Sequence, residues 1–273
     1  MIFHKHQPIP LLDKWVDCIL YVEGNNKGIG FPKAAMSLVF NLDDSFRLYS
    51  DNTFSKFTDY KKHWIAGFQT GPSYVENYGE SKMIVVQFKT AGAAVFLQQP
   101  LHSFTDNYIP LDCIFSNEAD LTWERICEAA TIDAKISVTE KFLSRHILQH
   151  KTNNEKFFYS FHTINGNRHQ LTIEEVCRQN NISRKHLNFL FKENLGVSPK
   201  TIASLNRFQH ILKVISNSKP GKLSGLAYEL DYFDQAHFNN SFRQFTGLRP
   251  GDYLKKVGSH PSLRFMPHFL PVA

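Results

Sequence analysis

The chain has 273 residues, which is enough for one large domain or two domains of ordinary size. With 42% hydrophobic and 21% charged residues and no apolar run of about 18 residues, the composition excludes a membrane-spanning protein and a disordered chain. The formal net charge is +6, and the first residues lack the apolar run of a secretory signal, so we expect a cytoplasmic protein without a membrane partner.

Strand-like runs rich in Val, Ile and aromatic residues fill the first third of the chain. They are Trp15–Glu23, Ala35–Leu42, Phe46–Ser50, Trp64–Phe68 and Lys82–Lys89. Gly28-Ile29-Gly30 is typical of a turn between strands, and Asp43-Asp44-Ser45 is typical of a hairpin. Several short strands at this spacing predict a sandwich or barrel.

Apolar residues then recur at helical spacing. They do so in Ala91–Gln99, Asp120–Ala130, Ser137–His150 and Glu155–Ile164. A polar cluster at 165–167 makes the better of two candidate domain boundaries. We therefore predict an α+β chain with a β-rich domain at 1–115, a helical linker segment at 116–166, an all-α domain at 167–257 and a C-terminal tail at 258–273.

The positive charge belongs to one block of the chain. Residues 165–257 hold 14 Lys and Arg against 7 Asp and Glu, a net charge of +7, whereas residues 1–164 hold 16 against 18. A block with twice as many basic as acidic groups suits a polyanion, because each neutralised phosphate releases condensed counterions. A solvated basic face that serves only solubility is the alternative on charge alone.

An internal repeat lies inside the basic block. The run Ser183–Pro199 recurs without a gap as 234–250, with His, Asn, Phe, Gly and Pro at matching positions. Ser183 and Asp234 are good helix N-caps, and Gly196 and Gly247 are good helix stops.

Each copy of the repeat follows a short helical stretch. These stretches are Thr172–Gln179, where Thr172 and Glu175 have the spacing of a capping box, and Leu223–Leu230. The turns are expected at 180–182 and 231–233. Each copy is therefore predicted as helix, short turn, helix, which is the pattern of a helix-turn-helix.

The exposed face of each second helix carries side chains that can read base edges. Asn and Gln pair with adenine, Lys and Arg pair with guanine, and an apolar group contacts the thymine methyl. The predicted DNA-binding residues are Arg184, Lys185, His186, Asn188, Phe189, Lys192 and Lys200 in the first copy and Gln235, Ala236, His237, Asn239, Asn240 and Arg243 in the second. Of these, Lys185, Asn188, Gln235 and Asn239 are expected to carry sequence preference, and Lys192, Lys200 and Arg243 to contact phosphates. Ordinary helix surface is the alternative for each residue taken alone.

These residues resemble the C-terminal domain of the AraC/XylS family of bacterial transcription regulators. The resemblance covers about residues 171–254, including the run from Tyr232 to Pro250, and departs from the family pattern at Asp231, where Gly is usual. It implies two helix-turn-helix units joined by a long helix over Ser198–Ser216, with recognition helices 183–194 and 234–245 in successive major-groove segments. Residues 64–107 are similar to the cupin-like effector domain of some such regulators, so residues 1–115 are expected to sense a small molecule or to dimerise.

The resemblance implies double-stranded DNA, a small-molecule effector, a second copy and RNA polymerase as candidate partners. The alternative is a cupin-type enzyme or a small-molecule-binding protein with an accessory DNA-binding domain. A metal-dependent cupin needs clustered histidines, whereas His4 and His6 lie at an expected frayed end and His63 and His102 lie alone. A methyl-accepting DNA repair protein needs clustered cysteines, and the four cysteines are far apart. We therefore expect no enzyme, no metal and no cofactor.

A ligand cavity in the β-rich domain stays open on the sequence. The aromatic residues of the strand-like runs are able to line the mouth of a barrel or to fill its core. They are Trp15, Tyr21, Phe31, Phe40, Trp64, Phe68 and Phe88. A stripe of rings on strands more often fills the core.

Overall fold

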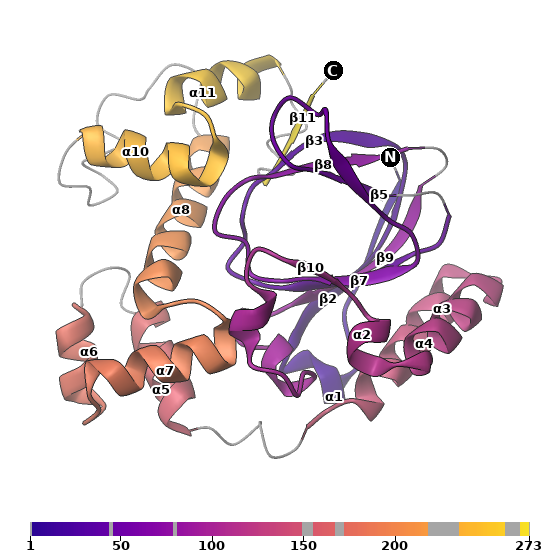
Figure 1. Cartoon of the computed structure of the whole chain (residues 1–273), viewed down its shortest axis with the longest axis horizontal. Helices are drawn as coiled ribbons and strands as arrows, with labels where there is room; N and C mark the ends of the chain where they lie inside the picture. The colour runs from indigo at the N-terminus through magenta and orange to yellow at the C-terminus, as the bar shows by residue number, and fades with distance from the viewer. Residues whose placement is uncertain are drawn as a thin grey trace.

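The computed structural model describes residues 2–43, 46–78, 81–148, 155–166, 172–217, 235–259 and 268–272. A β-rich N-terminal part is followed by a helical C-terminal part, and Figure 1 shows the helices α7, α8 and α10 beside the two sheets. The predicted α+β architecture with two domains is confirmed. The domain boundaries stay a prediction.

Two antiparallel sheets form the N-terminal part, and Figure 1 shows them facing each other. The first sheet has the order β1 (Ile2–His6), β2 (Val16–Glu23), β9 (Lys82–Phe88), β4 (Ser37–Asn41), β7 (His63–Ala66) and β10 (Tyr108–Pro110). The second sheet has the order β11 (Phe269–Pro271), β3 (Asn26–Gly30), β8 (Ser73–Asn77), β5 (Phe46–Tyr49) and β6 (Phe57–Tyr60). The predicted sandwich or barrel is confirmed.

Alternate residues of the first sheet face two different cores. Val39 of β4 packs between the sheets in one cluster with Phe46, Trp64 and Met83. Its neighbour Phe40 faces the other side, where its ring lies 5.8 Å from the ring of Phe142. Successive side chains of a strand point to opposite faces, so this sheet is buried on both sides.

Helices α3 (Asn117–Glu128) and α4 (Ile132–Arg145) cover the second face of this sheet. Trp123 of α3 donates from Nε1 to the carbonyl of Asn41 at the end of β4. Thr131 caps α4, because its hydroxyl accepts from the backbone N of Ala134 at 3.2 Å. The short helices α1 (Pro10–Asp13) and α2 (Asp112–Phe115) precede them.

The remaining helices form the C-terminal part. They are α5 (Glu155–Gly166), α6 (Ile173–Gln179), α7 (Arg184–Leu195), α8 (Pro199–Asn217), α10 (Gln235–Thr246) and α11 (Pro250–Ser259). Phe157 of α5 lies 5.6 Å from Phe191 of α7, between ring centroids, so α5 packs with this group. In the part of the chain that the structure describes, no helix is both long enough and apolar enough to span a membrane.

The expected turn at Gly28-Ile29-Gly30 is wrong, because these residues lie in strand β3. A Cβ on Gly28 would approach the carbonyl oxygen of Leu270 to 2.3 Å, so glycine is needed for the close approach of β11. The expected hairpin at 43–45 is also wrong. Strand β4 lies in the first sheet and β5 in the second, so the connection crosses between sheets. Asp44 and Ser45 lie outside the described residues.

Two further expectations about the N-terminal part are corrected. The stretch Ala91–Gln99 holds only the 3₁₀ helix η1 (Ala93–Val95), followed by η2 (Leu101–Phe104), because Pro100 cannot continue a helix. The N-terminus is not frayed, since β1 pairs with β2 from Ile2 to His6. His6 Nε2 lies 3.4 Å from Glu140 Oε1 of α4.

Part of the second repeat lies outside the described residues. This applies to the expected helix Leu223–Leu230, to the turn at 231–233 with Asp231, and to the N-cap Asp234.

Candidate nucleic-acid interface

Helix α6 begins with the capping box that the sequence predicts. The backbone N of Thr172 donates to Glu175 Oε2 at 2.7 Å, and the backbone N of Glu175 donates to Thr172 Oγ1 at 3.2 Å. The hydrogen bonds that the backbone N and the hydroxyl of Thr172 donate to the carboxylate hold the pKa of Glu175 below its usual value. The box satisfies amide groups that the first turn of a helix leaves without partners.

A tight turn leads from α6 to α7. Asn181 has a φ of 50°, in the left-handed region that Asn tolerates better than most residues. Ile182 then donates its backbone N–H to the carbonyl of Cys177 at 3.1 Å. Ser183 caps α7 by accepting from the backbone N of His186 at 3.1 Å. The predicted helix, short turn and helix of the first copy are confirmed.

Helix α7 has one buried and one exposed face. Its buried residues are Leu187, Leu190, Phe191 and Leu195. Its exposed residues include Arg184, Lys185, His186, Phe189 and Lys192, and Asn188 is half-buried. Phe189 is 56% exposed, so its ring is accessible to a partner. An exposed apolar ring among cations is suited to a partner that offers both phosphates and base edges.

Helix α10 repeats this pattern at the matching positions. Phe238, Phe242 and Phe245 are buried, whereas Ala236, Asn239, Asn240 and Arg243 are exposed. The side chains of Gln235 and His237 lie outside the described residues. Gly247 ends the helix with a φ of 72°, as Gly196 ends α7 with a φ of 85°. Both predicted helix stops are confirmed.

Helix α8 separates the two predicted recognition helices. Figure 1 shows α7 and α10 lying across opposite ends of α8. Their C-terminal ends contact the β-rich part, through η2 for α7 and through the loop before β8 for α10. Lys200 is exposed at the start of α8. The two polar helix faces therefore lie at opposite ends of one long helix, and their contacts with DNA stay a prediction.

Two polar groups of the first recognition helix have partners within the unit. Arg184 forms an ion pair with Glu174 of α6, with 3.1 Å between Nη1 and Oε1. Asn188 donates from Nδ2 to the carbonyl of Arg184 at 3.0 Å. The second Nδ2 hydrogen and the Oδ1 of an asparagine in this arrangement can still form a bidentate pair with adenine.

Sequence reasoning missed how the recognition helices rest on the β-rich part. Thr105 donates from Oγ1 to the carbonyl of Gly196 at 2.8 Å, and His102 Nδ1 lies 3.6 Å from Glu193 Oε1. A Cβ on Gly247 would lie 3.2 Å from Tyr74 Oη. These contacts join residues far apart in the chain, and no local pattern marks them.

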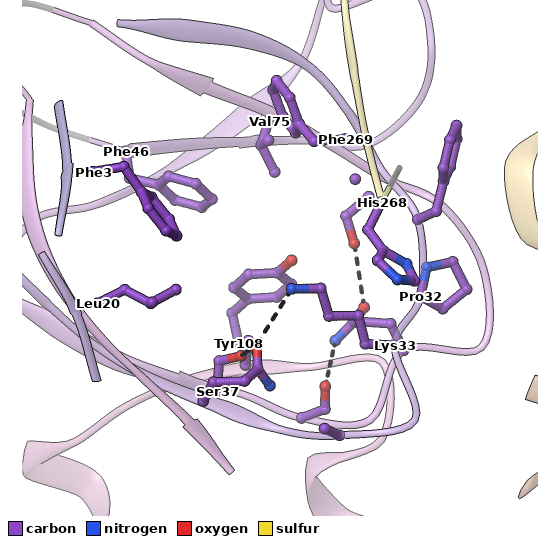
Figure 2. Close-up of a pocket in the computed structure, with 18 residues that line it drawn as sticks. Phe3, Leu20, Pro32, Lys33, Ser37, Phe46, Val75, Tyr108, His268 and Phe269 are labelled. Carbon is purple, nitrogen blue, oxygen red and sulfur yellow. Dashed lines mark hydrogen bonds between the residues drawn. The ribbon is translucent and has the colours of Figure 1, made fainter. Parts of the chain in front are cut away.

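A cavity of about 450 Å³ lies between the two sheets. Phe3, Leu20, Phe46, Val75 and Phe269 supply much of its apolar wall, and Lys33, Ser37 and Tyr108 are among its polar groups (Figure 2). Of the seven rings named above, only Phe31 lines this cavity. All seven are buried, which agrees with the core alternative.

Among the 18 residues that line the cavity, Lys33 is the one Lys, Arg, Asp or Glu side chain. Figure 2 shows its side chain extending into the cavity, and its Nζ donates to Gln87 Oε1 at 3.4 Å. Lys33 keeps contact with solvent there, but the surrounding protein lowers its pKa. Burial, followed by the nearby Lys33, lowers the pKa of His268 to about 4, so this imidazole is neutral at pH 7. In the described ranges no three His, Cys, Asp or Glu side chains are grouped as metal ligands.

Comparison with protein families finds two matches. Residues 176–256 match a family described as a helix-turn-helix domain, and residues 4–110 match a domain of unknown function (DUF6597). The first match covers α7, α8 and α10.

Curated relatives share part of the chain. The lactose operon transcription activator of Staphylococcus xylosus is 29% identical over 118 residues, which are 43% of this chain and 42% of that protein. The raffinose operon transcriptional regulatory protein RafR of Pediococcus pentosaceus is 29% identical over 87 residues, which are 32% of this chain and 31% of that protein. The chain therefore spans less than half the length of these relatives.

Solved structures of ToxT from Vibrio cholerae also match. One has a TM-score of 0.48 at 10% identity and covers 93% of this chain and 98% of its own. A second, with unsaturated fatty acid bound, has a TM-score of 0.44 at 13% identity and covers 92% and 94%.

Proposed function

We propose that this chain, whose C-terminal part belongs to the AraC/XylS family of transcriptional regulators, binds specific sites in double-stranded DNA and thereby regulates transcription. One observation carries the proposal. The duplicated motif forms two helices with matching bounds, α7 and α10, and each has an apolar buried face and a polar exposed face. Two such helices held by one long helix suit two successive segments of the major groove.

We assign two kinds of contact with DNA. Base edges are read by Lys185 and Asn188 of α7 and by Gln235 and Asn239 of α10. Phosphates are contacted by Lys192 of α7, Lys200 at the start of α8 and Arg243 of α10. Each phosphate contact that is lost lowers affinity on every DNA sequence, whereas a lost base contact lowers affinity mainly on the preferred site.

The β-rich part is proposed to be a non-catalytic sensor. The cavity combines an apolar wall with one cation, Lys33, which suits a small molecule with an apolar body and a single anionic group. An anion beside Lys33 Nζ would favour the charged ammonium that burial disfavours. A second copy is a candidate partner of the β-rich part, and RNA polymerase is a candidate partner of the chain.

The experiment uses the full-length chain and duplex DNA selected by the protein from a random pool. Asn239→Ala is expected to cost about 1–3 kcal/mol on the selected site and much less on random DNA. Lys192→Ala is expected to weaken both and to lower the salt slope by about 0.9. Lys61→Ala is the matched control, because it removes an exposed charge outside the basic block. Equal losses for Asn239→Ala on both DNAs, or no binding at low salt, would contradict the proposal.

A further inference from the structure

The last described strand returns from the DNA-binding half to the β-rich half. Strand β11 follows α11 in the sequence and pairs antiparallel with β3, with Leu270 opposite Ile29. Two backbone hydrogen bonds flank the pairing. Phe31 donates to the carbonyl of His268 at 2.7 Å, and Val272 donates to the carbonyl of Lys27 at 2.9 Å. The DNA-binding half therefore contributes an edge strand to the second sheet.

The side chains of β11 face two environments. Phe269 lines the cavity, as Figure 2 shows, and the preceding His268 also lines it. Leu270 points the other way and is fully buried in the cluster that also holds Phe31 and Tyr253. Because neighbouring residues of a strand alternate between faces, one short strand contributes one side chain to the cavity and another to the main hydrophobic core.

A continuous set of ring contacts runs from the cavity to the second recognition helix. Phe31 lines the cavity, and its ring lies 5.7 Å from the ring of Tyr253 in α11. Tyr253 is fully buried, and its ring lies 5.5 Å from that of Phe242 in α10. The first recognition helix instead contacts η2, which does not itself line the cavity, although Phe104 of η2 lies against the cavity residue Gly67.

We propose that β11 forms part of the wall that contacts a ligand in the cavity. Its docking on β3 couples occupancy of the cavity to the second helix-turn-helix unit. The inference rests on the sensing role proposed above. A molecule in the cavity contacts Phe269 only while β11 is docked, so binding must favour the docked strand. The docked strand shares a buried cluster with Phe31 and Tyr253, and Tyr253 contacts Phe242 of α10. Through β11 the ligand therefore acts on α10.

Two glycines of β3 provide a matched pair of variants. A Cβ on Gly28 would meet Leu270 O at 2.3 Å and Phe269 Cζ at 2.8 Å, and the three nearest atoms all belong to β11. A Cβ on Gly30 would meet nothing closer than Ser73 O at 3.7 Å. Gly28→Ala therefore blocks docking of β11, whereas Gly30→Ala makes the same change in the same strand and leaves docking intact. Gly30 also lines the cavity, so this variant is the control for docking and not for binding of the probe. A chain that ends at residue 267 removes β11 without changing β3.

The test measures amide hydrogen exchange in the full-length proteins with and without anilinonaphthalene sulfonate, an aromatic monoanion used as the probe. Gly28→Ala is expected to speed exchange at Phe31 at least about tenfold, and Gly30→Ala to leave it unchanged. In the wild type, the probe is expected to slow exchange in α10 at least about fivefold and to change exchange in α7 less. This effect should disappear in Gly28→Ala and in the chain that ends at residue 267.

The outcomes separate the inference from the proposed function. If Gly28→Ala behaves as Gly30→Ala, if the probe changes α7 as much as α10, or if the probe has no effect on α10, the inference is wrong, whether or not the chain binds DNA. If the expected exchange pattern is found but the chain binds no duplex DNA at low salt, the inference stands and the proposed function is wrong.

Discussion

The two recognition helices carry one repeated motif but rest on different supports. Helix α7 buries Leu187, Leu190 and Leu195, and its Phe191 packs on Phe157 of α5. Gly196, which follows the last residue of α7, packs against η2. Helix α10 packs on α8 and α11 through rings, with 4.9 Å between the centroids of Phe208 and Phe245. The second support reaches the cavity through rings, because Tyr253 contacts the cavity residue Phe31, whereas the first adjoins the cavity only through the backbone of η2 beside Gly67. A duplicated sequence thus gives two helices with the same surface chemistry and different connections to the sensor.

The largest expected effects come from removing one ring from each core. Phe191 and Phe242 occupy matching positions and are both fully buried. Replacing either with Ala is expected to cost about 3–5 kcal/mol in the free energy of unfolding, because a buried cavity is left behind. Denaturant unfolding measures the cost, and hydrogen exchange locates it. Phe191→Ala should loosen α6 and α7, and Phe242→Ala should loosen α10 and α11. Equal loosening of both units by either variant would show that the supports are not separate.

The two glycine stops provide the next comparison. Both have a positive φ, so Ala at either position costs about 1–2 kcal/mol from the backbone alone. At Gly196 the new Cβ would also lie 2.5 Å from the backbone oxygen of Leu101, whereas at Gly247 its nearest neighbour is the movable Tyr74 Oη at 3.2 Å. We expect Gly196→Ala to cost about 1–3 kcal/mol more than Gly247→Ala in thermal or denaturant unfolding.

A control for the glycine pair is available in the same region. Gly71→Ala places a Cβ 3.8 Å from Gln244 O, which is ordinary contact, and should change stability little. A larger cost at Gly247 than at Gly196 would contradict the arrangement in which η2 holds α7 more closely.

A smaller effect is expected at the cap of α6. Thr172→Ala removes both hydroxyl bonds of the capping box and is expected to cost about 1 kcal/mol. Thr172→Ser keeps the hydroxyl and serves as the control. Exchange should rise at the start of α6 and leave α10 unchanged, and a matching rise in α10 would argue against independent support of the two units.

The smallest expected effect on global stability is a pH dependence confined to β11. The pKa of His268 is lowered from 6.5 to about 4, so the folded state binds fewer protons than the unfolded state between these values. Its contribution is therefore complete above about pH 6.5 and is lost as the pH falls toward 4. Between pH 7 and pH 5 the protection of the Val272 amide, relative to the intrinsic exchange rate at each pH, should fall more than protection in α7 does. His268→Gln, which cannot titrate, should remove the difference, and an unchanged difference would assign the pH dependence to another group.

Sequence patterns predicted the first helix-turn-helix unit well because its signals are local. Thr172, Ser183, Gly196 and Pro199 each lie within a few residues of the helix end that they determine. The same holds for the polar faces of α7 and α10, since the helical period alone separates them from the buried faces. Their roles in binding DNA stay predictions.

The second sheet was poorly predicted because its partners are distant in the sequence. Gly28 and Gly30 are typical of a turn until β11 is placed beside them. Asp43 suggests a hairpin until β4 and β5 are seen in different sheets. The sequence also did not predict that Phe269 lines the cavity or that Gly196 packs against η2. The reason is the same, because each contact joins segments that meet only in the folded chain.

The central claim is that both recognition helices engage one duplex, and hydroxyl-radical footprinting of the full-length chain on its selected site tests it most directly. Two helices held at the ends of α8 should protect two segments on one face of the DNA, with centres about 34 Å apart. Asn239→Ala should weaken protection of one segment, and Asn188→Ala should weaken protection of the other. A single protected segment, or loss of both segments in either variant alone, would contradict the account.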